Sequence, residues 1–466
     1  MNDLSGAGLK PGAEAFRHLG RSVEAIRAEL GVDPVSVDPI RDPAVYELER
    51  EKIFRRTWLK VATDWEIPDK GDYKVKEMPV ADASVLIVRG KDGKVRAFHN
   101  VCTHRGNKVV PTSDFETFGK ARAGVLSCRF HGWVFNTDGP LRAVPLEDHF
   151  GKLDKACLGL REIACDTWEG FIFINFADPP EQTLAEYLGD FGKLFAGFPY
   201  HEATTAFRYS TVLECNWKVA LYAFSEGYHV PTIHAGSLPG FRGIEHSDFK
   251  LIGPHASSAI YGLGMEAAAS TAQFAGVLHG NPEHAPRPEL VPPGINPTGR
   301  PDFQFELPNI FPNFLIHLAA GCGYPGMAFF THQFWPLDHG RTLWEGINYF
   351  RPARNAAERI AQLHVNALHR NAWLEDTGTM EDTFTGIRSG AIDEMLLMDQ
   401  EFLIRHAART LWSCARWRCL KGPGPCGNSP NCGDCFATNC GWCGRCCATP
   451  GLRPPPSSRR CWRCSM

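Results

Sequence analysis

Two short segments hold the residues with the clearest metal chemistry in this chain. Cys102 and His104 form one pair, and Cys128 and His131 form a second pair. Thiolate sulfur and imidazole nitrogen are ligands of zinc, and they also hold a [2Fe–2S] cluster in which two histidines replace two cysteines on one iron. The two pairs therefore predict a metal centre with two sulfur and two nitrogen ligands, and they leave both kinds of centre open.

A second group of candidate ligands lies in residues 216–234 (NWKVALYAFSEGYHVPTIH). On a helix, Tyr222, Glu226 and His229 stand at i, i+4 and i+7 and share one face. Pro231 disfavours a longer helix, so the chain can turn and bring His234 back toward His229. Two histidines and a carboxylate from elsewhere would form the facial triad of a mononuclear iron(II) site. Two ordinary core or surface histidines are the alternative.

The residues around both groups resemble one known family. His104-Arg105-Gly106 and His131-Gly132-Trp133 resemble the Rieske signature of ring-hydroxylating oxygenases. Over roughly residues 40–413, the chain is similar to the large (α) subunit of Rieske non-haem iron aromatic-ring-hydroxylating oxygenases. Twenty-three residues separate the two ligand pairs, which is several more than the family usually has. We place the excess in residues 115–123, as a polar loop tip where an insertion costs little.

The resemblance implies the ligands of both metal centres. Cys102, His104, Cys128 and His131 would hold the [2Fe–2S] cluster. Glu226, His229 and His234 match the family's catalytic motif of an acidic residue, two residues, His, four residues and His. His229 and His234 would bind the mononuclear iron, and Glu226 would connect His229 to His131 of the neighbouring subunit. Many family members have Asp where this chain has Glu226, and Asn where it has Tyr222.

The third iron ligand must come from another part of the chain. Residues 374–381 (LEDTGTME) resemble the family's downstream acidic motif and imply Asp376 as the carboxylate ligand. The alternative is a solvated acidic turn that also includes Glu375 and Glu381.

The elements that must position these ligands change in character along the chain. From about residue 46 to 176 we expect short strands and glycine turns, with a hairpin over 85–98 and a buried strand over 171–176. Beyond residue 177 the pattern is α+β. Helices are predicted over 12–30, 184–198, 217–228, 356–373 and 392–411, and strands over 313–318, 328–334 and 343–349. The proline-rich residues 285–300 predict a surface loop.

Composition indicates an ordinary soluble protein for most of the chain. The 466 residues are 44% hydrophobic and 22% charged, with a net charge of −3. This balance gives no reason to expect a nucleic-acid or membrane partner. The N-terminal segment has no apolar stretch typical of a secretory signal, so we expect a cytoplasmic protein.

The C-terminal segment has a different composition. Eleven of the 17 cysteines crowd into residues 414–464, with many Gly, Pro, Arg and Trp residues. We interpret this tail as an aberrant, frame-shifted or disordered terminus. The alternative is a metal-binding appendage, because Cys432/Cys435 and Cys440/Cys443 resemble zinc-ligand pairs.

We therefore predict an α+β chain with a β-rich Rieske domain and a catalytic domain whose antiparallel sheet is covered by helices. The expected boundaries are 1–44 for an N-terminal helical segment on the catalytic domain, 45–168 for the Rieske domain, 169–413 for the catalytic domain and 414–466 for the tail.

The implied function is that of a terminal oxygenase. It would use dioxygen, with electrons from NAD(P)H delivered by a reductase or ferredoxin, to di- or mono-oxygenate an aromatic substrate. A homotrimer or an α3β3 assembly is expected. Because no basic cluster is evident for a carboxylated substrate, we expect an apolar ring. The predicted pocket residues are Tyr222, Phe224, Val230, Phe314 and Leu315. A Rieske electron carrier, or the inactive product of a disrupted gene, is the alternative.

Overall fold

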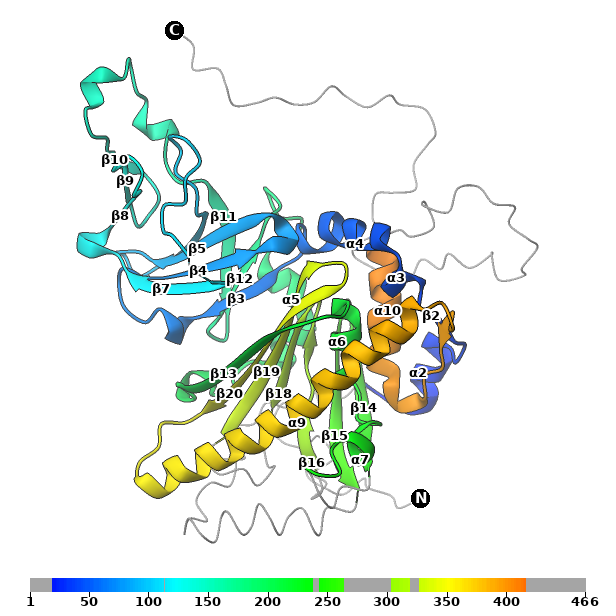
Figure 1. Cartoon of the computed structure of the whole chain (residues 1–466). Helices are drawn as coiled ribbons and strands as arrows, with labels where there is room; N and C mark the ends of the chain where they lie inside the picture. Colours follow the sequence, from blue (N-terminus) through cyan, green and yellow to red (C-terminus); the bar gives the residue numbers. More distant parts are fainter. Residues whose placement is uncertain (1–18, 113, 238–242, 264–302, 319–326, 416–466) are drawn as a thin grey trace, which may run out of the picture. The chain divides into compact units, whose positions relative to one another are not determined.

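The protein is an α+β molecule built on antiparallel sheets, as the sequence predicts (Figure 1). The computed structural model describes residues 19–112, 114–237, 243–263, 303–318 and 327–415, which belong to one compact unit. The predicted tail, apart from Cys414 and Ala415, and the predicted loop over 285–300 lie outside the described residues. The four domain boundaries stay predictions.

A seven-stranded sheet forms the first layer, in the strand order β3-β12-β11-β6-β5-β4-β7. Its strands are β3 (Leu59–Thr63), β4 (Asp72–Met78), β5 (Ala83–Arg89), β6 (Val95–His99), β7 (Glu116–Lys120), β11 (Glu162–Trp168) and β12 (Phe171–Asn175). The predicted hairpin is confirmed, because β5 pairs with β6 in antiparallel register. The strand expected over 171–176 is also confirmed as β12, and its five residues are all buried.

A small three-stranded sheet extends from this layer. It consists of β8 (Val125–Ser127), β9 (Val134–Asn136) and β10 (Leu141–Ala143). Phe98, Phe135 and Trp133 pack here in one hydrophobic cluster with Cys102 and Cys128. A rigid sheet framework therefore holds the loops that carry both cysteines.

The prediction of a loop tip over residues 115–123 is wrong. Residues 116–120 form β7, which pairs with β4 at the edge of the seven-stranded sheet. The backbone hydrogen bonds to β4 outweigh the weak strand propensity of this polar stretch. The additional residues between the two ligand pairs thus extend a sheet instead of forming a free loop.

A nine-stranded sheet forms the second layer. Its strands are β1 (Gly20–Arg21), β13 (Thr205–Leu213), β14 (Gly243–Ile252), β15 (His255–Leu263), β16 (Phe303–Glu306), β17 (Asn309–Ile310), β18 (Phe314–Leu318), β19 (Met327–Asp338) and β20 (Arg341–Phe350). The three strands predicted in this region correspond to β18, β19 and β20, and the last two are longer than expected. Neighbouring strands pair in antiparallel fashion.

Helices cover this sheet on both faces. They are α2 (Val23–Leu30), α3 (Asp38–Arg41), α4 (Pro43–Glu49), α5 (Leu184–Phe195), α6 (Trp217–Ala223), α7 (Val230–Ile233), α9 (Ala356–Arg388) and α10 (Phe402–Ala415). The helices α6 and α9 pack on the face of Leu315, and α5 packs on the opposite face, that of Phe314. In Figure 1, α9 runs obliquely across the strands β13 to β20. Asn355 begins α9 by accepting a hydrogen bond from the backbone N–H of Glu358, which is the usual role of an N-cap side chain.

All five predicted helices differ from the structure in their bounds, and those predicted to end at 198 and 228 end at Phe195 and Ala223. Of the helix predicted over 12–30, residues 12–18 lie outside the described residues, and α2 begins at Val23, after an N-cap at Ser22, because Gly20 and Arg21 form β1 and pair with β14. The helix predicted to end at 373 continues to Arg388. The helix predicted over 392–411 begins at Phe402, because Glu394 and Met395 form β21 and pair with β2 (Val35–Ser36).

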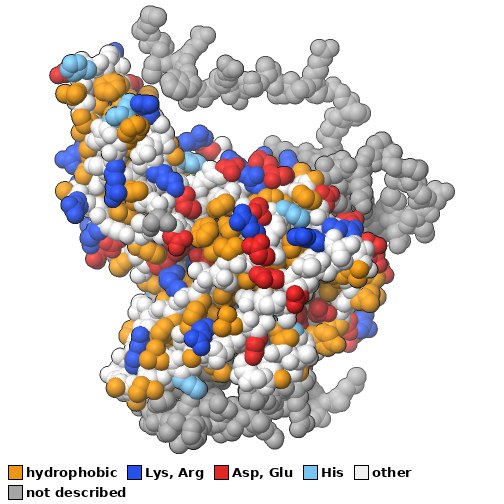
Figure 2. Space-filling view, viewed as in Figure 1, with side chains coloured by type: hydrophobic (Ala, Val, Ile, Leu, Met, Phe, Trp, Pro, Cys, Tyr) orange, Lys and Arg blue, Asp and Glu red, His pale blue; other side chains and the backbone are white. Residues whose placement is uncertain are grey.

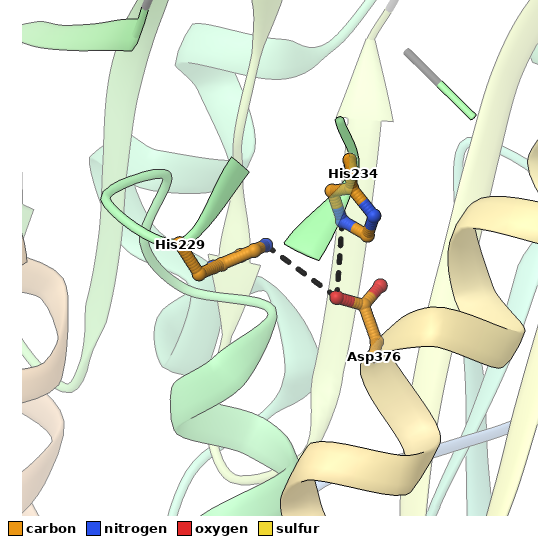
Figure 3. A group of neighbouring side chains, drawn as sticks. All are labelled: His229, His234 and Asp376. Carbon is orange, nitrogen blue, oxygen red and sulfur yellow. Dashed lines mark ion pairs between the residues drawn. The ribbon is translucent and has the colours of Figure 1, made fainter. Parts of the chain in front are cut away.

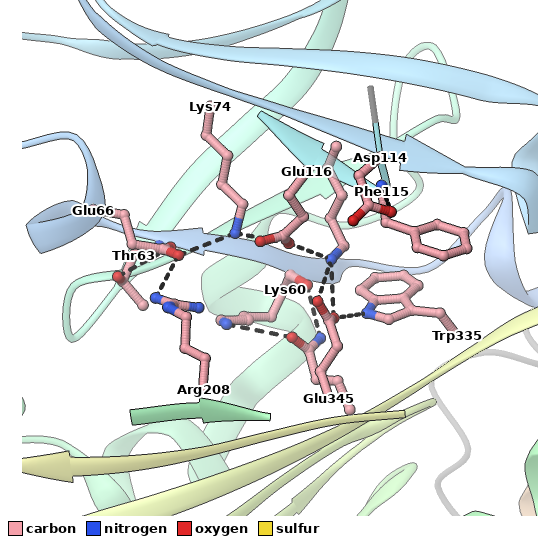
Figure 4. Close-up of polar contacts among 12 residues, drawn as sticks. Lys60, Thr63, Glu66, Lys74, Asp114, Phe115, Glu116, Arg208, Trp335 and Glu345 are labelled. Carbon is pink, nitrogen blue, oxygen red and sulfur yellow. Dashed lines mark hydrogen bonds and ion pairs between the residues drawn. The ribbon is translucent and has the colours of Figure 1, made fainter. Parts of the chain in front are cut away.

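A buried network of charges joins the two large sheets (Figure 4). On β4, Lys74 Nζ lies 3.0 Å from Glu66 and 2.9 Å from Glu116. On the same face, Lys76 Nζ lies 2.6 Å from Glu116 and 2.9 Å from Glu345 of β20. Arg208 of β13 completes the network through Glu66 at 2.7 Å. Of these five ion pairs, Lys76–Glu345 and Glu66–Arg208 reach strands of the nine-stranded sheet.

Neither sign of charge dominates the face of the molecule that Figure 2 shows. Figure 2 shows basic and acidic side chains interspersed over one face of the molecule, in line with the net charge of −3. No helix among the described residues combines the length and the apolar character that crossing a membrane requires.

Candidate metal centres

Two matching turns present the first four candidate ligands. In one turn the Gly106 N–H donates to the Cys102 carbonyl at 3.0 Å, and in the other the Gly132 N–H donates to the Cys128 carbonyl at the same distance. The two glycines have φ of 78° and 71°, a conformation that residues with a Cβ rarely adopt. Each turn therefore places its cysteine and histidine in the same way, and glycine is required at its end.

The two cysteines and the two histidines differ in how deeply they are buried. Cys102 and Cys128 are each 2% exposed, and Asn107 Nδ2 approaches the Cys128 sulfur at 3.6 Å. The rings of His104 and His131 are half-buried, with centroids 4.6 Å apart, and His104 stacks on Trp133 at 4.8 Å. A sulfur side directed inward and an imidazole side near the surface fit a [2Fe–2S] cluster whose two irons have different ligands.

A single zinc ion fits these four residues less well. Zinc gathers its ligand atoms around one point. Among the described residues, one group of His, Cys or acidic side chains could hold a metal ion. It consists of His229, His234 and Asp376, whose ligand atoms all lie within 4.8 Å of one another. The two Cys/His pairs do not form such a group, which argues against a single zinc ion held by all four residues.

The segment before the second site is folded differently from the prediction. α6 ends at Ala223, so Tyr222, Glu226 and His229 do not share a helix face. Pro231 does not end a helix but stands in the first turn of α7, where its missing N–H costs nothing. His229 and His234 flank this short helix, and one helical turn brings them together.

His229, His234 and Asp376 converge on one point (Figure 3). Asp376 Oδ1 lies 3.5 Å from His229 Nε2 and 3.1 Å from His234 Nε2. Asp376 is 4% exposed and belongs to the interior of α9 instead of a solvated turn. Two imidazole nitrogens and one carboxylate oxygen form the donor set that suits a non-haem iron(II) with open positions.

The second nitrogen of each imidazole contacts a carboxylate. His229 Nδ1 is paired with Glu226 Oε1, and the backbone N–H groups of Tyr228 and His229 donate to Glu226 Oε2. His234 Nδ1 lies 2.8 Å from Glu375 Oε2, which also accepts a hydrogen bond from Ser237 at 2.6 Å. Such outer carboxylates fix the ring orientation and leave Nε2 as the metal-binding atom.

The sequence predicted no ligand role for Glu375, which was named above only as part of an alternative acidic turn. Its position directly before Asp376 could have indicated such a role, because consecutive residues of a helix lie at neighbouring positions around its axis. Burial lowers the pKa of His234, but Asp376 and Glu375 outweigh burial and raise it above its ordinary value. The pair thus makes the surroundings of His234 strongly negative, as a divalent cation requires.

The predicted pocket residues lie in two separate parts of the core. Phe224 and Leu315 belong to one hydrophobic cluster, and Tyr222 packs in the same cluster. Phe314 belongs to another cluster, where its ring contacts Phe171 at 5.4 Å. Phe314 and Leu315 diverge because successive residues of β18 face opposite sides of the sheet. Val230 is buried at the start of α7. Their contact with a substrate stays a prediction.

Two family descriptions match this chain, in the order of its sites. Residues 57–158 match the Rieske [2Fe-2S] domain, and residues 200–415 match the catalytic domain of the ring hydroxylating alpha subunit. The first match contains both Cys/His turns, and the second contains His229, His234 and Asp376.

Individual proteins show the same similarity. The chain is 33% identical over 258 residues to the large oxygenase component of the naphthalene 1,2-dioxygenase system of Pseudomonas aeruginosa, over 54% of this chain and 55% of that protein. It is 33% identical over 194 residues to the oxygenase subunit of carnitine monooxygenase from Acinetobacter pittii, over 41% and 50% of the two chains. The chain thus spans about half the length of the curated relatives it matches.

Solved structures support the fold. Naphthalene 1,2-dioxygenase from Rhodococcus sp., bound to indole, matches with a TM-score of 0.64 and 20% identity, over 89% of this chain and 99% of that one. The same arrangement of a Rieske domain and a helix-covered antiparallel sheet is therefore present in both.

Proposed function

This chain belongs to the Rieske ring-hydroxylating oxygenases, and on that premise we propose that it is the large, catalytic subunit of an enzyme that hydroxylates an organic ring. The observation that carries the proposal is the presence of both donor sets in one chain. Cys102, His104, Cys128 and His131 would hold the [2Fe–2S] cluster. His229, His234 and Asp376 would hold a mononuclear iron.

The protein side chains around the mononuclear site would orient the iron ligands. When bound, the cluster supplies single electrons, and an iron(II) with three protein ligands keeps positions open for dioxygen. Glu226 and Glu375 each accept the Nδ1 proton of one imidazole, which directs both Nε2 atoms toward Asp376. The buried Asp376 carboxylate balances the positive charge of the metal.

The partners we propose follow from the separation of the two sites. Figure 1 shows β8, β9 and β10, beside the Cys/His turns, well apart from α7 and α9. We therefore propose that the Cys/His turns of one copy lie beside the mononuclear site of a neighbouring copy, and that Glu226 is the residue that would face them. We infer a homotrimer or an α3β3 assembly, which receives electrons from NAD(P)H through a reductase or a ferredoxin.

A single-turnover experiment tests this function. Protein with its cluster chemically reduced is mixed with ¹⁸O₂ and a candidate substrate, and the product is analysed by mass spectrometry. Naphthalene and carnitine are suitable first substrates, because the relatives named above act on them. We expect labelled product from the unchanged protein and none from Asp376→Ala. Asp382→Ala changes an exposed acid on the same helix and serves as the matched control.

The opposite result would also be clear. If the reduced cluster is reoxidised by dioxygen and the unchanged protein labels no compound of a broad panel, the chain acts as an electron carrier and the proposed function is wrong.

A further inference from the structure

Four buried histidines lie close together on the inner side of the nine-stranded sheet. They are His246 of β14, His317 of β18, His332 of β19 and His369 of α9, with exposed fractions of 2, 6, 0 and 7%. The rings of His317 and His332 have centroids 5.1 Å apart. His317 and His332 are not among the seven candidate metal ligands, so the proposed function gives these two histidines no role.

This histidine cluster adjoins the mononuclear site. His332 stacks on Phe224, with a centroid distance of 4.1 Å, and meets Trp373 edge-on at 5.0 Å. Phe224 precedes Glu226 by two residues, and Trp373 precedes Asp376 by about one turn of α9. The segment from the end of α6 to α7, together with α9, carries the proposed iron ligands and also covers the His332 ring.

Apolar rings surround the two histidines. His317 stacks on Phe330 at 4.2 Å and contacts Phe305 at 5.1 Å. Leu315, one of the predicted pocket residues, pairs directly with His332 across the sheet. An apolar lining that contains a few fixed polar groups is typical of small-molecule sites.

Three ring nitrogens in this lining have no hydrogen-bond partner among the described residues. They are both nitrogens of His317 and the Nε2 of His332. The other two histidines are held in place, since His246 Nδ1 lies 2.8 Å from Ser258 Oγ and His369 Nδ1 lies 2.8 Å from Asn348 Oδ1. Buried polar atoms are normally paired, so unpaired ones indicate a missing partner.

The structure also defines which kind of hydrogen bond His332 offers. Trp344 Nε1–H can only donate, and it lies 3.2 Å from His332 Nδ1. His332 Nδ1 is therefore the acceptor, and Nε2 carries the proton as an unpaired donor. Burial, followed by the neighbouring histidines, lowers the pKa of His317 and His332 well below the ordinary value, so both rings are neutral.

We propose that His317 and His332 bind a neutral polar group of the substrate, such as a ring hydroxyl, that both accepts and donates a hydrogen bond. The proposal rests on the oxygenase function and replaces the expectation of a purely apolar ring. The hydroxyl oxygen would accept from His332 Nε2–H, and the hydroxyl proton would be donated to the free ring nitrogen of His317. The Phe224, Phe305 and Phe330 rings would contact the aromatic part.

Equilibrium binding to the oxidised holoprotein, without any reductant, tests the proposal independently of turnover. The probes are naphthalene and 2-naphthol, which differ by one hydroxyl, and calorimetry gives both dissociation constants. We expect 2-naphthol to bind at least about tenfold more tightly to the unchanged protein, because a site built for a hydroxyl disfavours the analogue that lacks it.

Substitutions then assign the preference to the histidines. His317→Phe keeps the ring but removes both nitrogens, and we expect it to abolish the preference for 2-naphthol while the Tm stays the same or rises. His317→Asn, which can still donate and accept, should retain part of the preference. Phe305→Leu changes the packing against His317 without removing a polar atom, and should weaken the binding of both probes alike.

Several outcomes would overturn the proposal. The first is that the unchanged protein binds 2-naphthol no more tightly than naphthalene, or does not bind it. The second is that His317→Phe keeps the preference for 2-naphthol. A crystal structure in which ordered water pairs all three nitrogens while 2-naphthol is bound elsewhere would overturn it as well. Failure of the oxygenase function would appear as missing labelled product and would leave this binding comparison unaffected.

Discussion

Each imidazole of His229 and His234 has one nitrogen directed at Asp376 and one that contacts its own carboxylate. Because the two rings are fixed from the outside, their metal-binding atoms are aligned before any metal arrives. Pre-alignment of this kind raises metal affinity. The carboxylate of Glu375 is therefore as much a part of the site as that of Glu226, although only Glu226 matches the family motif.

Replacement of Glu375 tests this role at the level of one side chain. Because Glu375→Ala frees the His234 ring, we expect the affinity of the mononuclear site for iron(II) to fall about 10–100-fold. The Glu375 side chain is 32% exposed and its hydrogen bonds go to His234 and Ser237, so its loss should change the Tm little. Iron titration of the metal-depleted protein measures the effect, with Asp382→Ala as the matched control. Equal affinities of the two variants would show that Glu375 has no positioning role.

The two Cys/His turns illustrate how local sequence defines an element. Each turn needs a glycine with positive φ four residues after its cysteine, and Gly106 and Gly132 meet this requirement. The ligands of these turns are close in sequence, so their grouping was predictable. The end of α6 was not, because the helical spacing of Tyr222, Glu226 and His229 continues past Ala223, where the helix ends.

Long-range packing explains the underestimated length of α9. The central residues 376–379 (DTGT) have weak helix preference, so the sequence suggested an end at 373. Met380, Phe384 and Ile387 are nevertheless buried at helical spacing and extend the helix. This tertiary contribution, which places Asp376 inside a helix, cannot be read from local propensity.

Two glycine substitutions test these elements in opposite directions. Gly106→Ala forces a Cβ into φ of 78° and should lower the free energy of unfolding by about 1 kcal/mol. Gly378→Ala lies in the α9 interior, where an added Cβ meets nothing within 4 Å, and should raise it by up to about 1 kcal/mol. Urea unfolding measures both, and an unchanged stability of Gly106→Ala would contradict the proposed role of the turn.

The charge network between the two large sheets contributes to the stability of the whole compact unit. The alternation of Lys74 and Lys76 with apolar residues on β4 indicates a solvated face, yet both side chains are 2% exposed. The sequence could not reveal this, because Glu345 and Arg208 come from strands far along the chain. Burial raises the pKa of Glu66, but Lys74, Arg208 and Lys60 outweigh it and lower the pKa to about 2.

This lowered pKa predicts a pH dependence of stability. Because an unfolded glutamate has a pKa of about 4.3, the folded state binds fewer protons, and the stabilisation by Glu66 is fully present above about pH 5. It is lost as the pH falls toward 2. We expect Glu66→Gln to lower the free energy of unfolding by about 3 kcal/mol at pH 7 and to flatten the acid limb.

Urea unfolding between pH 3 and pH 7 measures this effect. Glu47→Gln, at an exposed ion pair with Arg50, is the control and should change the stability by less than about 1 kcal/mol. An acid limb of the Glu66→Gln variant as steep as that of the unchanged protein would show that other groups carry the pH dependence.

The central claim is that one chain builds both a [2Fe–2S] cluster and a mononuclear iron site. The most direct measurement is the content of iron and acid-labile sulfide per chain in anaerobically purified protein. We predict about three irons and two sulfides for the unchanged protein, and about two of each for Asp376→Ala. About two irons and two sulfides in the unchanged protein, the same as in the variant, would contradict the claim.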